Sequence, residues 1–206
     1  MTPGAALDRG LGEMALALPA GGRERLLEYV ALLVKWNRTY NLTAIRDPLA
    51  MVAHHLLDSL VVLPHLPLAE ARGRLADAGS GAGLPGIPLA IARPGWRVVL
   101  AESSQKKCAF LRQAAIELEL TNVEVREGRV ESWRPEPLFE VVISRAFAAL
   151  EEFIATCGHL AAPGGMLAAM KATPPEDLTA SCALIRLRVP FLEAQRHLVL
   201  CRASSP

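Results

Sequence analysis

A glycine-rich segment and an acid downstream of it carry the clearest chemical signal in this sequence. Residues 77–86 read Asp-Ala-Gly-Ser-Gly-Ala-Gly-Leu-Pro-Gly, between an apolar run and an apolar helix. Glycines at such a position let the backbone approach a ligand closely, and the free N–H groups of a helix start favour a carboxylate or phosphate. Glu102 ends the next apolar run, about 20 residues past the glycine loop. An acid at this position typically binds the two hydroxyls of a ribose. The pattern predicts a nucleoside-cofactor site.

Two residues bear on which nucleoside cofactor it is. Residues 81–86 also fit the G-x-G-x-x-G pattern of dinucleotide sites, so an NAD(P)-dependent oxidoreductase stays open. However, Asp77 suits the cationic amine of a methionine better than a pyrophosphate, and Pro85 removes an N–H that a diphosphate would use. The D-x-G-x-G-x-G form therefore favours S-adenosylmethionine (SAM). A SAM methyltransferase that acts on a protein or a small molecule is a further alternative.

Repeated strand-then-helix patterns are expected to position these residues. From residue 71 on, short β-like runs alternate with helical ones, and residues 183–190 and 195–202 form a closing antiparallel pair. This alternation predicts an α/β fold with a doubly wound, mostly parallel sheet of seven strands, with its ligand outside the carboxyl ends of the strands. We divide the chain into a flexible segment (1–22), a short N-terminal helical cap (23–70) and a SAM-dependent methyltransferase domain (71–206) of Rossmann-like, class I type.

Composition excludes several classes of protein. The chain has 206 residues, 51% of them hydrophobic and 21% charged, and no apolar run approaches the length that spans a bilayer. We read no signal peptide and expect a cytoplasmic, monomeric protein that contacts no membrane. The four cysteines form no C-x-x-C pair, so we expect free buried thiols and no metal site. A net charge of +1 does not indicate a general polyanion binder.

Several motifs resemble one family, the small-subunit ribosomal RNA methyltransferases known as RsmG or GidB. The resemblance rests on the glycine loop with its Leu-Pro-Gly-Ile-Pro extension, and on Glu-Ser-Ser-Gln-Lys-Lys at 102–107 and Ser-Arg-Ala-Phe at 144–147. Upstream, Asn-Leu-Thr at 41–43 and His-Leu-Leu-Asp-Ser-Leu at 55–60 also match, and neither belongs to the general SAM fold. The match runs from about residue 25 to residue 202, with Leu84 standing where Phe is common.

The resemblance implies methylation of N7 of one guanine in the decoding region of 16S rRNA, within the small ribosomal subunit or an assembly intermediate. Together, the motifs and the resemblance assign the site residues in three groups. The cofactor-binding residues are Asp77, Gly79, Ser80, Gly81, Gly83, Leu84, Glu102, Ser103, Arg129, Val130, Glu131 and Arg145. The catalytic residues are Arg145 and Lys171, and the substrate-binding residues are Asn41, Thr43, His55 and Asp58. Local capping of turns is the competing interpretation of the last four.

The residue types suit that reaction. Guanine N7 carries a lone pair in the ring plane and no proton, so its methylation needs no general base. No cysteine pair or Asn-Pro-Pro-Tyr motif, which would serve other methylations, is present. Catalysis is therefore expected to consist mainly of holding N7 in line with the methyl–sulfur bond. Reaching a guanine in folded RNA is expected to require its extrusion.

Overall fold

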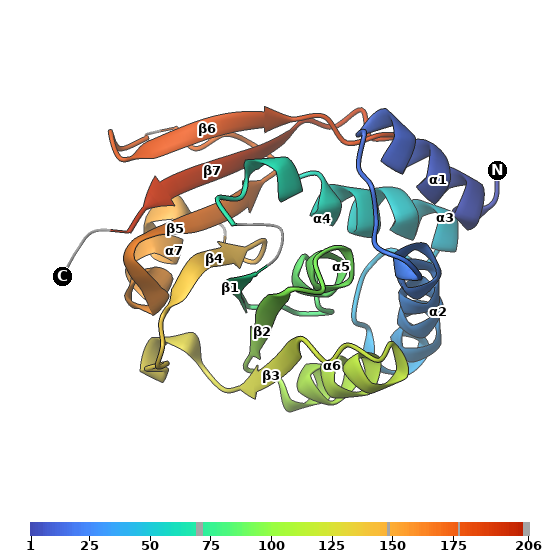
Figure 1. The fold of residues 1–206 in the computed structure, drawn as a ribbon, viewed down its shortest axis with the longest axis horizontal. Helices are drawn as coiled ribbons and strands as arrows, with labels where there is room; N and C mark the ends of the chain where they lie inside the picture. Colours follow the sequence, from blue (N-terminus) through green and yellow to red (C-terminus); the bar gives the residue numbers. More distant parts are fainter. Residues whose placement is uncertain (69–71, 148, 177, 204–206) are drawn as a thin grey trace.

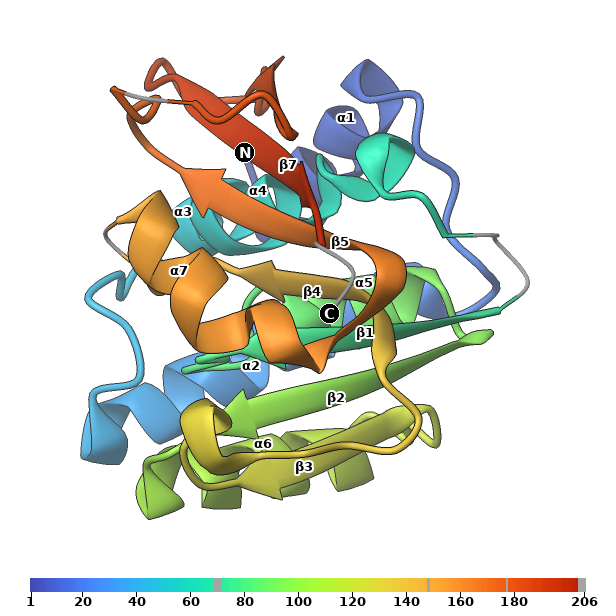
Figure 2. The ribbon, with the colours of Figure 1, turned by 90° about the vertical axis from the view of Figure 1, so that its left-hand side faces the viewer.

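A computed structural model describes residues 1–68, 72–147, 149–176 and 178–203 of the chain. Its centre is a seven-stranded sheet in the order β3-β2-β1-β4-β5-β7-β6 (Figures 1 and 2). The strands are β1 (Gly73–Ala78), β2 (Trp96–Glu102), β3 (Val123–Glu127), β4 (Phe139–Ser144), β5 (Ala161–Lys171), β6 (Cys182–Leu187) and β7 (Arg196–Arg202).

The first five strands pair in parallel and the last two do not. β7 is antiparallel to both β5 and β6, so β6 points the same way as the parallel strands. The carboxyl ends of β1 to β6 therefore meet at one edge of the sheet. This confirms the α/β class and the mostly parallel seven-stranded sheet with a closing antiparallel pair, although β6 ends at Leu187 and β5 begins five residues earlier than the sequence indicated.

Helices cover the two faces of the sheet unequally. One face packs α5 (Gly86–Ala92), α6 (Gln105–Glu117) and the N-terminal helices, while α7 (Leu150–Cys157) lies on the other (Figure 1). Because side chains alternate along a strand, Val98 and Leu100 join the larger core and Val99 joins the smaller. Short 3₁₀ turns complete the set: η2 (Leu63–His65), η3 (Val130–Ser132) and η4 (Gly158–Leu160).

The N-terminal helices form a layer over the larger core. α2 (Gly22–Tyr40) buries the expected stripe of Leu26, Val30 and Leu33. The following helix is split into α3 (Pro48–Met51), a π-helical segment η1 (Val52–Leu57) and α4 (Asp58–Leu60). The boundary at residues 70 and 71 lies outside the described residues. Among the described residues, no helix is long and apolar enough to cross a membrane.

The prediction of a loose segment over residues 1–22 was wrong for residues 3–13. These residues form α1 (Pro3–Glu13), with Thr2 as its N-cap and Leu7 fully buried against the core. Arg23 holds the helix through both oxygens of Asp8, at 2.5 and 2.9 Å. The glycine- and alanine-rich composition did not indicate a helix, because this helix is stabilised by packing against the rest of the protein.

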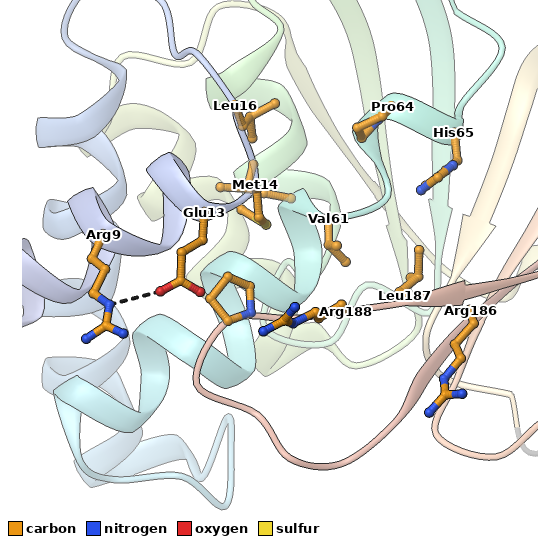
Figure 3. Close-up of a pocket in the computed structure, with 12 residues that line it drawn as sticks. Arg9, Glu13, Met14, Leu16, Val61, Pro64, His65, Arg186, Leu187 and Arg188 are labelled. Carbon is orange, nitrogen blue, oxygen red and sulfur yellow. Dashed lines mark hydrogen bonds and ion pairs between the residues drawn. The ribbon is translucent and has the colours of Figure 1, made fainter.

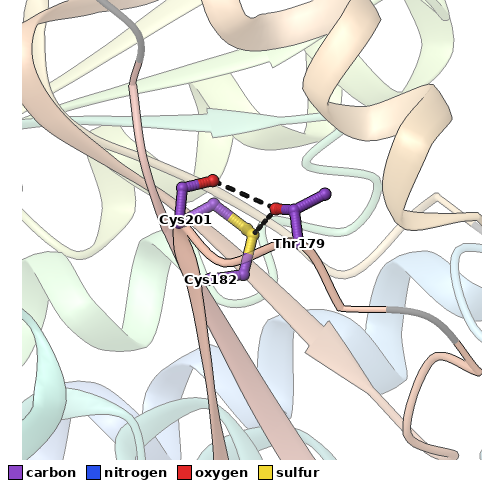
Figure 4. The surroundings of a disulfide bond; sticks show 4 residues. Thr179, Cys182 and Cys201 are labelled. Carbon is purple, nitrogen blue, oxygen red and sulfur yellow. Dashed lines mark hydrogen bonds between the residues drawn. A yellow bond between two sulfur atoms is a disulfide. The ribbon is translucent and has the colours of Figure 1, made fainter.

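The prediction of four free thiols was wrong for two of them. A disulfide joins Cys182 and Cys201, which lie directly opposite each other on β6 and β7 (Figure 4). Only Cys108 and Cys157 are free among the described residues, and both are buried. Sequence spacing does not reveal this pairing, because it depends on the register of the two strands.

Candidate functional site

The glycine loop is fastened to the carboxyl edge of the sheet by backbone hydrogen bonds. The N–H groups of Gly79 and Ser80 both donate to the carbonyl of Ala101, at 2.9 and 3.0 Å. Gly79, Gly81 and Gly83 all have positive φ angles, of 72°, 60° and 91°. Such angles disfavour side chains with a Cβ, so the glycines set the path of this loop.

Glu102 locks the loop from the end of β2. Its Oε2 accepts a hydrogen bond from the Gly81 N–H at 2.9 Å, and its Oε1 accepts one from the Ser104 N–H at 2.8 Å. The side chain is 6% exposed and lines a cavity. Glu102 therefore shapes the loop as well as facing the space in which the predicted ribose contact would be made.

Asp77 lies behind the loop. Its carboxyl group is completely buried, and Oδ2 accepts a hydrogen bond from the Gly86 N–H at 2.9 Å. Burial raises the pKa of Asp77 to about 7. Its Oδ1 is also buried and has no hydrogen-bond partner within the described ranges. Asp77 does not line the neighbouring cavities, so its position supports a structural role, and contact with the cofactor amine stays a prediction.

A tyrosine from α2 also supports the loop. The hydroxyl of Tyr29, which is completely buried, donates to the carbonyl of Ala82 at 2.6 Å. Burial raises the pKa of Tyr29 well above its usual value, so the hydroxyl keeps its proton. Sequence reasoning missed this contact, because the two residues are 53 positions apart.

Three cavities along the carboxyl edge share lining residues with one another, and we call them together the crevice. The first, called the β2 compartment, holds about 390 Å³ between Glu102 and the segment 128–131. The second, the loop compartment, holds about 250 Å³ beside Gly79–Leu84 and shares Gly79 and Ala146 with the first. The third, the cap compartment, holds about 370 Å³ and shares Thr43 and Arg145 with the second.

The cap compartment is built around a buried carboxylate. Asp58, at 3% exposure, binds Arg145 from the end of β4 at 3.0 Å and Arg196 from the start of β7 at 2.9 Å. Arg145 also donates to the carbonyl of His54 at 3.1 Å. Burial makes such pairs costly unless their hydrogen bonds are satisfied. Asp58 thus fixes two guanidinium groups at the wall of the compartment.

Other polar groups complete the same compartment. The Oγ1 of Thr43 lies 2.9 Å from Nε2 of His55. Burial, together with the charge of Arg145, lowers the pKa of His55 to about 4, so its imidazole is neutral at pH 7. Lys171 donates to the carbonyl of Phe147 at 2.7 Å, and burial lowers the pKa of its ammonium group.

The structure brings most of the predicted site residues to this crevice. Asp77, Gly83 and Asn41 do not line it: Gly83 faces Ile87 and Leu111, and Asn41 is an exposed C-cap of α2. The residues in the β2 compartment are Gly79, Glu102, Ser103, Arg129, Val130 and Glu131. Ser80, Gly81, Leu84 and Arg145 line the loop compartment. Thr43, His55, Asp58, Arg145 and Lys171 line the cap compartment.

Sequence reasoning missed Arg196 and His197 in the cap compartment. No motif marks them, since their place depends on the antiparallel return of β7. It also missed Asn37, whose buried amide bonds both the N–H and the carbonyl of Thr43 at 2.9 Å and so holds the Asn-Leu-Thr turn.

The backbone at Gly81 leaves room for a ligand beside the loop. A Cβ built on Gly81 would meet only one protein atom within 4 Å, the carbonyl oxygen of Gly79 at 3.9 Å. The position therefore opens toward the loop compartment, where a methyl group would take up ligand space. Carboxylate acceptors for hydroxyl and amine groups stand beside it in the β2 compartment, on Glu102 and Glu131.

Comparison with known proteins finds relatives that match almost the whole chain. The family model GidB, described as rRNA small subunit methyltransferase G, matches residues 23–202. A protein of Nitrosospira multiformis named ribosomal RNA small subunit methyltransferase G is 48% identical over 216 residues, which covers 98% of each chain. Its namesake in Methylobacillus flagellatus is 50% identical over 202 residues, covering 96% of this chain and 97% of the relative.

Solved structures share the fold at low sequence identity. A SAM-dependent methyltransferase from Aquifex aeolicus aligns with a TM-score of 0.56 at 17% identity, over 76% of this chain and 94% of that one. A SAM-dependent O-methyltransferase from Thermotoga maritima aligns with a TM-score of 0.58 at 16% identity, over 84% and 72%. These likenesses confirm the class I methyltransferase fold predicted from the sequence.

Proposed function

Since the chain belongs to the rRNA small subunit methyltransferase G family, we propose that it transfers a methyl group from SAM to N7 of a guanine in 16S rRNA. The observation that supports this most directly is that the loop compartment and the cap compartment adjoin each other, since both are lined by Thr43 and Arg145. A methyl donor on the loop and a base under the cap would then lie side by side. Because the family is one of methyltransferases, the NAD(P) oxidoreductase alternative is set aside.

The β2 and loop compartments would hold the cofactor. When bound, SAM supplies an electrophilic methyl group on a cationic sulfur. Glu102 and Glu131 offer acceptors for ribose hydroxyls and the adenine amine, while the backbone of Gly79 and Gly81 admits the cofactor closely. Glu102 is already fixed by two backbone N–H donors, so its carboxylate needs little rearrangement to accept further hydrogen bonds.

The cap compartment would hold the guanine. N7 and O6 are neighbouring acceptors on one edge of guanine, so a donor to O6 orients N7 and leaves its lone pair free. Arg145 and Lys171 supply such donors at the ends of adjacent strands, and Asp58 holds the Arg145 guanidinium in place. His55 is neutral at pH 7, so it adds no positive charge next to a base that becomes cationic as it is methylated.

Labelled SAM tests the proposal. Small ribosomal subunits from cells that lack the gene are incubated with the protein, and the 16S rRNA is mapped by mass spectrometry. We expect one N7-methylguanine in the decoding region, and at least a hundredfold lower rate with Arg145→Ala. Labelling of free metabolites or of ribosomal proteins, with the rRNA unmodified, would overturn the assignment. SAM, but not NAD, is expected to raise the melting temperature.

We further propose that the enzyme works as a monomer in the cytoplasm, where ribosomal subunits assemble.

A further inference from the structure

A large cavity lies outside the crevice. It holds about 670 Å³ between the end of α1, the segment from α4 to η2, and the connection from β6 to β7 (Figure 3). We call it the α1 groove. Its apolar floor includes Leu16, Val61, Pro64 and Leu187, and three arginines, one histidine and one acid also line it.

The arginines differ in how they are paired. Arg9 binds Glu13 at 2.9 Å and lies over the ring of Phe191, with 5.3 Å to the ring centroid. Arg186 and Arg188 are exposed, and neither has a hydrogen bond or an ion pair with any residue that the structure describes. Figure 3 shows their guanidinium groups apart from the Arg9–Glu13 pair. The groove therefore carries two positive charges that no described residue pairs, in a chain whose net charge is +1.

The α1 groove adjoins the cap compartment. Leu187, the last residue of β6, lines both cavities. The helical stretch 52–65 also runs past both, since His54, His55 and Asp58 line the cap compartment, and Leu60, Val61, Pro64 and His65 line the groove. Because β6 points the same way as the parallel strands, Arg186 and Arg188 lie at the same edge of the sheet as the cofactor loop.

We propose that the α1 groove binds the sugar-phosphate backbone of the RNA that presents the target guanine. The inference rests on the proposed function and extends it from the base to its flanking strand. Arg186 and Arg188 would contact phosphates, and the apolar floor would lie against riboses or an unstacked base. Single-stranded nucleic acid is bound in this way, by a basic groove that follows the backbone.

Charge favours RNA over a protein partner as the occupant. A single acid, Glu13, lines the groove, and Arg9 already pairs with it. Free guanidinium groups suit phosphates, which they can bind through two parallel hydrogen bonds. The nucleotides on either side of an extruded guanine are joined to it through the RNA backbone. They must therefore lie on a protein surface next to the cap compartment, as the α1 groove does.

Charge reversal at matched positions tests the proposal. Arg188→Glu is compared with Arg202→Glu, which changes an exposed arginine on β7 at the opposite edge of the sheet. With small subunits as substrate, we expect Arg188→Glu to raise KM for the subunit at least tenfold. The kcat and the SAM affinity should match those of Arg202→Glu. Arg186→Ala and Arg188→Ala should each make the dependence of log Kd on log salt shallower by about one unit.

The results separate this inference from the proposed function. If the wild-type protein methylates the subunits and Arg188→Glu behaves like Arg202→Glu, the inference is wrong and the function stands. If the wild-type protein leaves the rRNA unmodified, the function fails. Photo-crosslinking then still tests directly whether RNA lies in the groove. p-Benzoylphenylalanine in place of Pro64 should crosslink to 16S rRNA. The same residue in place of the exposed Ile116, outside the groove, should not. A crosslink from position 64 to ribosomal proteins alone would contradict the inference.

Discussion

His55 gives the cap compartment a measurable signature at the scale of one residue. Its pKa is about 4 in the folded protein, lowered by burial and by the charge of Arg145, against 6.5 in the unfolded chain. Between these values the unfolded state binds more protons than the folded state. His55 therefore does not lower the free energy of unfolding above pH 6.5. As the pH falls from 6.5 toward 4, the free energy of unfolding decreases, because the unfolded chain is stabilised by taking up this proton.

In the wild type, the pKa shift of His55 should lower the free energy of unfolding by about 3 kcal/mol between pH 6.5 and pH 4. We predict that His55→Gln abolishes this decrease. Urea unfolding at several pH values measures it, with His54→Gln as the control for loss of a neighbouring imidazole. Asp77 acts in the opposite sense, because its raised pKa of about 7 makes stability fall as the pH rises toward 7. The difference between variant and wild type, rather than the wild-type profile, therefore isolates His55. Parallel profiles for the two proteins would contradict this assignment.

Residue types marked part of the site from the sequence alone. Asp58, His55 and Arg145 stand in short motifs, and the structure brings them together in one compartment. Arg196 was not predicted, because its partner Asp58 lies 138 positions away and only the path of β7 unites them. The burial of Asp77 was not predicted, because it follows from packing that sequence spacing does not report.

At the scale of an element, the glycine loop allows a controlled substitution. Gly81 and Gly164 both have positive φ angles, of 60° and 75°, and an added Cβ has room at both. Alanine at either position should cost about 1 kcal/mol of stability through backbone strain. Only Gly81 lines the crevice, so we predict at least a tenfold weaker SAM affinity for Gly81→Ala and none of that loss for Gly164→Ala. Isothermal titration measures both, and equal affinities would remove the loop from the cofactor site.

The β6–β7 hairpin supplies a second prediction at this scale. The disulfide links residues 19 positions apart at the end of the hairpin away from the crevice. Closing a loop of that length stabilises the fold by about 3 kcal/mol through the unfolded state. We predict that dithiothreitol, or Cys182→Ser with Cys201→Ser, lowers the free energy of unfolding by up to that amount without changing SAM affinity. A melting temperature unaffected by reduction of the bond would contradict this.

Most elements could be predicted from hydrophobic patterns, since buried parallel strands read as short apolar runs between turns. The exceptions share a cause. Helix α1, the early start of β5 and the end of β6 at Leu187 depend on what packs against them rather than on local sequence. The asymmetric helix layers could not be predicted either, because alternation alone does not say on which face a helix lies.

At the scale of the whole molecule, helix α2 supports the loop that we propose binds the cofactor. Tyr29→Phe removes the hydrogen bond to Ala82 and leaves a buried carbonyl without that donor. We predict a loss of about 1–3 kcal/mol in the free energy of unfolding, together with weaker SAM binding because Ala82 lines the loop compartment. Urea denaturation and calorimetry measure the two effects. Tyr40→Phe, at an exposed position on the same helix, should change neither.

The sharing of Asp58 between Arg145 and Arg196 has an electrostatic consequence for the free enzyme. Two cations and one anion cannot neutralise one another, so the triad retains a surplus positive charge that attracts mobile counterions. An arriving RNA strand must displace those counterions, which makes inorganic phosphate and sulfate in the assay buffer competitors of the substrate.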